Sequence, residues 1–152
     1  MSSGISIEAL VLRRATQDDA ELAYHVTERA MRDYVIATFG TWQETEVRKN
    51  TSAAASAGRS QVIELDSVPV GILTVERLPT HIQLHQLFIL PQYQRQGIGT
   101  HLLRRILSDA AVASLPVRLR VLRCNPARAL YERHGFSVTS ESPERFYMER
   151  VP

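Results

Sequence analysis

A segment near the middle of the chain combines two glycines with polar residues in an order suited to binding an anion. It runs Gln94-Arg95-Gln96-Gly97-Ile98-Gly99-Thr100, between a strand-like run and a helix-like run. Glycines at such a junction let backbone N–H groups of the first helical turn point into open space, where the positive end of the helix dipole favours phosphate oxygens. The segment therefore predicts a phosphate-binding loop.

Two common phosphate-binding loops do not fit this segment. A P-loop has Lys followed by Ser or Thr after its last glycine, whereas Thr100-His101 follow Gly99 here. A dinucleotide fingerprint has three glycines and an acidic residue about twenty positions further on, where this chain has Arg118 and Arg120. A nucleoside triphosphatase and a dinucleotide enzyme are disfavoured, and a nucleotide-binding protein that uses the loop differently stays open.

A second segment follows the loop in a fixed order. A strand-like run over Val117–Leu122 leads to Asn125 and then to Tyr131, which stands in a short helix-prone run. With Gln94-x-x-Gly97-x-Gly99 upstream, this order resembles the GNAT superfamily of N-acetyltransferases. The resemblance covers residues 82 to 150 specifically, and the first eighty residues match the superfamily only in general layout.

The resemblance implies acetyl-coenzyme A as acyl donor, with its pyrophosphate on the main-chain amides of the loop. The residues implied at the pyrophosphate are Arg95, Gln96, Gly97, Ile98, Gly99 and Thr100. The backbone of Leu87, Phe88 and Ile89 would pair with the pantetheine arm, and the Ile89 N–H would lie near the thioester carbonyl. Asn125 and Ala127 would contact the coenzyme arm, and an N-cap before Pro126 is a further role for Asn125.

Acyl transfer from a thioester to an amine needs a base for the ammonium, a donor for the oxyanion and a proton for the departing thiolate. By resemblance, Tyr131 is the acid that protonates the thiolate, and packing in the core is the alternative role for this side chain. Ribosomal-protein acetyltransferases have a glutamate base where this chain has Arg120. His85 is the candidate base, directly or through a water, because imidazole titrates near neutral pH; the alternative is a hydrogen-bonded strand residue.

The acceptor side is predicted from the first half of the chain. Glu28, Tyr34 and Trp42 are the candidate residues for binding the amine, and simple packing is the alternative for the tryptophan. Cys124 is a conceivable nucleophile, but no histidine can be assigned beside it. Direct attack of the amine in a ternary complex is therefore expected.

Charge is distributed unevenly along the chain. From residue 91 onward there are ten arginines and five acids, and the first ninety residues carry eight basic and eleven acidic residues. A basic second half suits a donor with several phosphates, and an acidic first half suits a cationic acceptor. Polyamine-like or aminoglycoside-like molecules, amino acid derivatives and protein amines stay open as acceptors. The net charge of +2 is too small to indicate nucleic acid binding.

The secondary-structure pattern places these residues on a mixed α/β fold. Alternating or apolar runs predict strands at residues 7–14, 61–65, 68–76, 81–89, 117–122, 136–140 and 145–150. Helices are predicted at 16–31, 44–57, 101–113 and 126–134, the first with a Thr16/Asp19 capping box. Alternation along 81–89 predicts that His81, Gln83, His85, Leu87 and Ile89 share one face.

Length and composition fit one compact domain. With 152 residues and 44% hydrophobic content, residues 1–152 are expected to form a single N-acetyltransferase domain. The expected fold is α+β and GNAT-like: a mixed, mostly antiparallel sheet of about six or seven strands, splayed at the cofactor site and flanked by about four helices.

The remaining expectations concern location and partners. We expect a cytoplasmic protein with no membrane segment, because no apolar run reaches a bilayer-spanning length, and neither a disulfide nor a metal site, because the chain has one cysteine. Oligomeric state, a homodimer included, is left open. The rival to an enzyme is a non-catalytic acyl-coenzyme A sensor or regulatory module.

Overall fold

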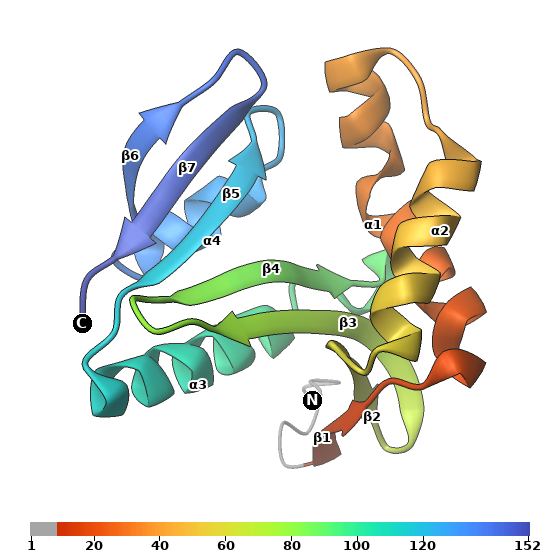
Figure 1. Cartoon of the computed structure of the whole chain (residues 1–152), viewed down its shortest axis with the longest axis horizontal. Helices are drawn as coiled ribbons and strands as arrows, with labels where there is room; N and C mark the ends of the chain where they lie inside the picture. The colour runs from red at the N-terminus through yellow and green to blue at the C-terminus, as the bar shows by residue number, and fades with distance from the viewer. Residues whose placement is uncertain (1–8) are drawn as a thin grey trace, which may run out of the picture.

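A computed structural model of the chain describes residues 9–152, which form one seven-stranded sheet with four α-helices (Figure 1). The strands are β1 (Leu10–Arg14), β2 (Ser60–Leu65), β3 (Val68–Arg77), β4 (Ile82–Ile89), β5 (Val117–Leu122), β6 (Ser137–Glu141) and β7 (Arg145–Arg150). The α-helices are α1 (Ala20–Phe39), α2 (Glu44–Ser56), α3 (Ile98–Ala113) and α4 (Ala127–Arg133). Within the described residues no helix is long and apolar enough to cross a membrane.

The sheet is mixed and mostly antiparallel, as the sequence predicts. Its strand order is β1-β2-β3-β4-β5-β7-β6, and β4 with β5 is the parallel pair. That pair is short: Ile82 opposes Val117 and Gln83 opposes Arg118. Beyond these residues the strands part, and Figure 1 shows β5, β7 and β6 diverging together from β4. The predicted splay is therefore present.

Each face of the sheet buries its own hydrophobic cluster. On β2 and β3, Val62 and Ile72 pack with α1 and α2, whereas their neighbours Ile63 and Leu73 pack with α3. Successive strand residues point to opposite faces of the sheet, so two adjacent apolar residues contribute one side chain to each cluster. The larger cluster continues under β5 and β7 and includes Tyr131 of α4. Thus α1 and α2 cover one face, and α3 and α4 cover the other.

Local signals account for most element boundaries. The Thr16 N–H donates to the Asp19 carboxylate at 2.8 Å, as the predicted capping box requires. Asp66 and Ser67 have φ of 51° and 65°, the left-handed conformation of a two-residue hairpin between β2 and β3. The predicted first strand is found at Leu10–Arg14, and its residues 7 and 8 lie outside the described residues.

Two helices are longer than predicted. The central helix α3 begins at Ile98, within the glycine segment, rather than at residue 101. The first helix does not end near Met31 but runs to Phe39, where Gly40 with φ of 84° terminates it. No glycine or proline interrupts Arg32–Thr38, and this part of α1 lies outside both hydrophobic clusters of the core. The sequence signal for the end of α1 is therefore Gly40.

Candidate active site

A cleft of about 590 Å³ opens where β4 and β5 part. Its walls come from the separating halves of these strands, the segment after β4, the start of α3, α4 and the last turns of α1. Because only two residues of each strand are paired, the edge of β4 from Leu84 to Ile89 has no partner strand on this side among the described residues. The divergence of the two strands thus creates the cleft.

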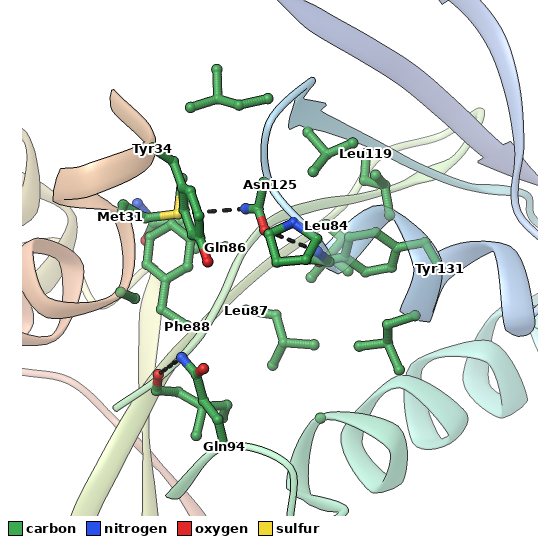
Figure 2. A pocket seen from close by; sticks show the side chains of 18 of the residues that line it. Met31, Tyr34, Leu84, Gln86, Leu87, Phe88, Gln94, Leu119, Asn125 and Tyr131 are labelled. Atoms are coloured by element: carbon green, nitrogen blue, oxygen red, sulfur yellow. Dashed lines mark hydrogen bonds between the residues drawn. The ribbon is translucent and has the colours of Figure 1, made fainter. Parts of the chain in front are cut away.

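The glycine segment forms one end of this cleft. Gly97 has φ of 87° and Arg95 has φ of 62°, so the chain turns sharply into α3. No backbone N–H from Arg95 to Thr100 donates a hydrogen bond within the described residues. The Gln94 side chain donates to the Ile89 carbonyl at 2.9 Å and ties the segment to the end of β4 (Figure 2). The result is a row of free donors at a helix N-terminus beside the cleft.

Strand β4 contains a bulge that the alternating pattern did not predict. Gln86 opposes Thr74 and Leu84 opposes Val75, so His85 is an extra residue on β4. The predicted common face of residues 81 to 89 is therefore wrong: Leu87 and Ile89 pack in the cluster that contains Leu84, on the α3 side. Beyond the bulge, Gln86 and Phe88 point to the α1 side, as Figure 2 shows.

His85 and the end of β4 present two different groups at the cleft. His85 Nε2 lies 2.9 Å from Glu76 Oε1 on β3. The Leu90 N–H donates to Val70 of β3, and N–H directions alternate along a strand, so the Ile89 N–H is directed away from β3 toward the cleft side. Leu87, Phe88 and Ile89 all line the cleft, as does His85.

Tyr131 reaches the cleft from α4, between β4 and β5 (Figure 2). Tyr131 is 8% exposed, and its ring packs edge-on against the ring of Phe136, with the two ring centroids 5.7 Å apart. Burial raises the pKa of the Tyr131 phenol to about 12. The hydroxyl has no hydrogen-bond partner within the described residues. Tyr131 is therefore both part of the core and a protonated donor at neutral pH.

Asn125 joins α4 to α1. Its Oδ1 accepts from the Ala127 N–H at 2.9 Å, which is the cap role considered for it, and its Nδ2 lies 3.8 Å from Met31 Sδ (Figure 2). Asn125 and Ala127 both line the cleft. Cys124 lies outside the cleft lining and contacts Thr38 and the Tyr34 carbonyl of α1.

The acceptor-side residues predicted from the first half are divided by the structure. Tyr34 lines the cleft, whereas Glu28 and Trp42 do not. Trp42 Nε1 donates to the Tyr24 hydroxyl at 2.9 Å, and that hydroxyl donates to Glu28 at 3.0 Å. Burial raises the pKa of Tyr24, and Arg48 lies over its ring at 3.9 Å. These residues join α1 to α2 away from the cleft.

Besides Ala30, four residues on the last turns of α1 line the cleft, and of these only Tyr34 was predicted from the sequence. They are spaced at i, i+3, i+4 and i+8, and they are Met31, Tyr34, Val35 and Phe39. Met31 is the predicted end of this helix, and the other three follow it. Extending the helix to its glycine stop would have shown this stripe.

The ionised side chains of the cleft are all cationic. Arg95, Arg120, Arg133 and Arg145 line it, and among the described lining residues there is no Asp or Glu. Three carboxylates of the acidic first half form ion pairs outside the cleft lining: Glu21 with Arg48, Glu28 with Arg32, and Asp19 with Arg13. No group of three or more metal-ligating side chains converges in residues 9–152.

The cleft lies where two parallel strands part, and free amides stand at the start of the helix that follows. Comparison with known proteins identifies the family that has this fold. A family model for the acetyltransferase (GNAT) domain matches residues 56–138. The chain belongs to the GNAT acetyltransferase family. No curated protein gave a significant match.

Solved structures of this family share the fold. PaiA N-acetyltransferase from Thermoplasma acidophilum, solved in complex with coenzyme A, superposes with a TM-score of 0.73 at 19% identity, over 94% of this chain and 99% of that one. An acetyltransferase from Thermus thermophilus superposes with a TM-score of 0.75 at 22% identity, over 95% of this chain and 97% of that one. Ard1 from Thermoplasma volcanium superposes with a TM-score of 0.68 at 19% identity, over 94% of this chain and 97% of that one.

Proposed function

We propose that this chain is a single-domain N-acetyltransferase that moves an acetyl group from acetyl-coenzyme A to a primary amine by direct attack in a ternary complex. The observation that carries the proposal is the cleft itself, with the free amides of Arg95–Thr100 at one end and the Tyr131 hydroxyl between β4 and β5. The PaiA N-acetyltransferase that shares this fold was solved with coenzyme A, which supports the same class of donor here.

The loop residues fit a diphosphate. Six successive backbone N–H groups lack partners within the described residues, and those of Gly97 to Thr100 stand at the positive end of α3. The space beside Gly97 is open, so phosphate oxygens can approach the backbone. Arg95 and Arg133 add positive charge at the cleft. In this proposal Arg95, Gln96, Gly97, Ile98, Gly99 and Thr100 hold the pyrophosphate.

The free edge of β4 fits the pantetheine arm. Amide groups of the arm can pair with the backbone of Leu87, Phe88 and Ile89 as a further strand would, since β5 leaves this edge unpaired. Asn125 and Ala127 line the same cleft. The Ile89 N–H, directed away from β3, then donates to the thioester oxygen as it becomes an oxyanion.

The proposed chemistry needs three proton transfers. The ammonium loses its first proton to His85, directly or through a water, and Glu76 acts as a positioning residue through its contact with the imidazole Nε2. The nitrogen then bonds to the acyl carbon and releases its second proton to solvent, and the carbon–sulfur bond breaks to leave a neutral amide. Tyr131 gives its proton to the leaving thiolate, whose pKa is near 8.5 for an ordinary thiol. Solvent returns the proton to the phenolate.

Direct transfer is favoured over an acyl-enzyme. Cys124 lies outside the cleft lining and has the Tyr34 carbonyl and the Thr38 hydroxyl as neighbours, rather than a base. Proximity of two bound substrates supplies much of the rate in such a mechanism.

Thiol release from acetyl-coenzyme A in the presence of a broad panel of amines tests the proposal. The enzyme hypothesis is supported if the wild type releases thiol in an amine-dependent way and Tyr131→Phe lowers the rate of release without changing the affinity for coenzyme A. Tyr147→Phe is the matched control, because Tyr147 lies on β7 outside the cleft lining. Binding of acetyl-coenzyme A without thiol release from any amine would instead support the sensor.

A further inference from the structure

The acceptor side of the cleft carries two arginines that have no acidic partner. Arg120 on β5 and Arg145 on β7 line the cleft, and neither forms an ion pair with a carboxylate of the described residues. Other arginines of the same part of the sheet are paired, Arg118 with Glu149 and Arg123 with Glu141, both at 2.7 Å. Two free guanidinium groups in one cleft indicate that an anion belongs there.

The two guanidinium groups are close enough to share one anion. In the β5–β7 ladder, Arg120 opposes Tyr147 and Leu122 opposes Arg145. Arg120 and Arg145 are therefore diagonal neighbours on one face of the sheet, a relationship that separates Cα atoms by about 7–8 Å. Arginine side chains span such a distance easily, and their planar forks match a carboxylate.

The position of this pair separates it from the proposed diphosphate site. On β5 and β7, Leu119, Phe146 and Met148 pack in the cluster of α3 and α4, so the alternate residues Arg120 and Arg145 face the other way, toward α1. The Arg145 guanidinium lies 5.5 Å from the centre of the Phe39 ring of α1. The free amides at the start of α3 are on the opposite face. With the proposed diphosphate site on the opposite face, the α1 side is the part of the cleft left for an acceptor, and the pair stands there.

We propose that Arg120 and Arg145 bind a carboxylate of the acceptor, which makes the acceptor an amino acid with an apolar side chain rather than a polyamine. This inference rests on the acyl transfer proposed above. The apolar part of the acceptor packs against the stripe of α1 that contains Met31, Tyr34 and Phe39, which lines the same cleft. The absence of Asp and Glu from the described lining removes the groups that a polycation would need.

Matched pairs of amines test the carboxylate. Leucine, methionine and phenylalanine are compared with their amides and with the corresponding decarboxylated amines, by thiol release from acetyl-coenzyme A. We expect kcat/KM at least about tenfold higher for the amino acids, because they alone carry the carboxylate that the two guanidinium groups would hold by charge-assisted hydrogen bonds; a tenfold change corresponds to about 1.4 kcal/mol. Equal or better turnover of the amides overturns the inference and leaves the acyl transfer intact.

Two variants and a control locate the recognition. Arg120→Gln and Arg145→Gln should lose the preference for the carboxylate, mainly through KM, while their turnover of the amides stays near that of the wild type. Arg118→Gln is the control, because Arg118 lies two residues away on the same face of β5 but outside the cleft lining. Equal loss toward amino acids and amides in the Arg120 and Arg145 variants contradicts the assignment. Thermal unfolding verifies that each variant is folded.

A binding measurement separates this inference from the activity. N-acetyl amino acids and their amides are titrated into protein saturated with coenzyme A, by calorimetry. We expect tighter binding of the carboxylates, by about tenfold, and loss of that difference in Arg120→Gln. No difference in the wild type overturns the inference even if no amine is acetylated. Absence of thiol release with every amine overturns the proposed function alone.

Discussion

His85 Nε2 lies 2.9 Å from Glu76 Oε1, across the β3–β4 pair and at the residue where β4 bulges. A bulge redirects side chains at the edge of a site. Here the extra residue is His85 itself, which contacts the Glu76 carboxylate. Beyond the bulge the alternation is reversed, so Leu87 and Ile89 lie on the same face as Leu84. This pairing gives the imidazole a fixed orientation in the mechanism proposed above.

The pH profile of turnover should depend on His85. A general base must be unprotonated to act, so in the wild type kcat/KM should fall as the solution is made acidic. His85→Gln should lower the rate by about 100-fold or more, as loss of a general base does, and should abolish this fall. An unchanged profile in His85→Gln removes the residue as base.

Glu76→Gln separates positioning from proton transfer. The imidazole stays in place as the base but loses the carboxylate that orients it, so we expect a loss of about tenfold in kcat with KM for acetyl-coenzyme A unchanged. The acid-side fall in rate should persist in this variant. A profile identical to that of His85→Gln would contradict a positioning role.

Gly97→Ala should impair coenzyme binding specifically. An alanine at φ of 87° costs roughly 1–2 kcal/mol of stability, and its methyl group enters the space where phosphate oxygens approach. We expect KM for acetyl-coenzyme A to rise about tenfold. Gly40→Ala is the matched control, because Gly40 has φ of 84° and equally open surroundings but ends α1 away from the loop. A similar KM increase in both variants would show that the effect comes from strain alone.

Tyr131 should make the wild type sensitive to alkali. The folded pKa of this phenol, about 12, exceeds its ordinary value of 10.0 because the group is buried. The folded state therefore binds the proton more tightly, and the associated stability, present below pH 10, is lost as pH rises from 10 to 12. Relative to Tyr131→Phe, the wild type should lose roughly 2–3 kcal/mol of unfolding free energy over this interval. Urea unfolding at both ends of the interval measures the difference, and a constant difference contradicts the burial effect.

Asp19 should make the fold sensitive to acid. Two hydrogen bonds from Arg13, at 2.8 and 2.9 Å, hold the pKa of Asp19 below its ordinary value of 3.8. The stability from the ionised carboxylate is present above pH 3.8 and is lost as pH falls through the lower folded value. Asp19→Asn should cost about 1–2 kcal/mol near pH 7, since Arg13 is partly exposed, and much less near pH 2, as urea unfolding at the two pH values measures. A cost independent of pH would refute this account.

The fold was largely predictable because its signals are local. Apolar alternation and the capping box at Thr16 locate the strands and helices to within a few residues, except for the end of α1, which lies eight residues beyond the predicted one. The glycine segment of residues 94–100 could be predicted as a phosphate-binding loop because its residues are continuous in the sequence. Asn125 and Tyr131 follow it at a short distance along the chain.

The acceptor side was less predictable because it depends on geometry between elements. Glu28 and Tyr34 are six residues apart, which separates them by about 120° around a helix, so they cannot face one cleft. Residue types alone do not reveal this phase. The β4 bulge likewise has no sequence signature. The acidic first half gave no acidic cleft lining, and its residues Asp19, Glu21 and Glu28 pair with arginines outside the cleft.

Thiol release in wild type and Tyr131→Phe, with acetyl-coenzyme A and saturating amine, tests the central claim most directly. The account predicts amine-dependent release by the wild type, a kcat lower by about 100-fold in Tyr131→Phe, and equal dissociation constants of the two proteins for coenzyme A. Equal kcat values for the two proteins, or tight coenzyme binding with no release from any amine, would contradict it.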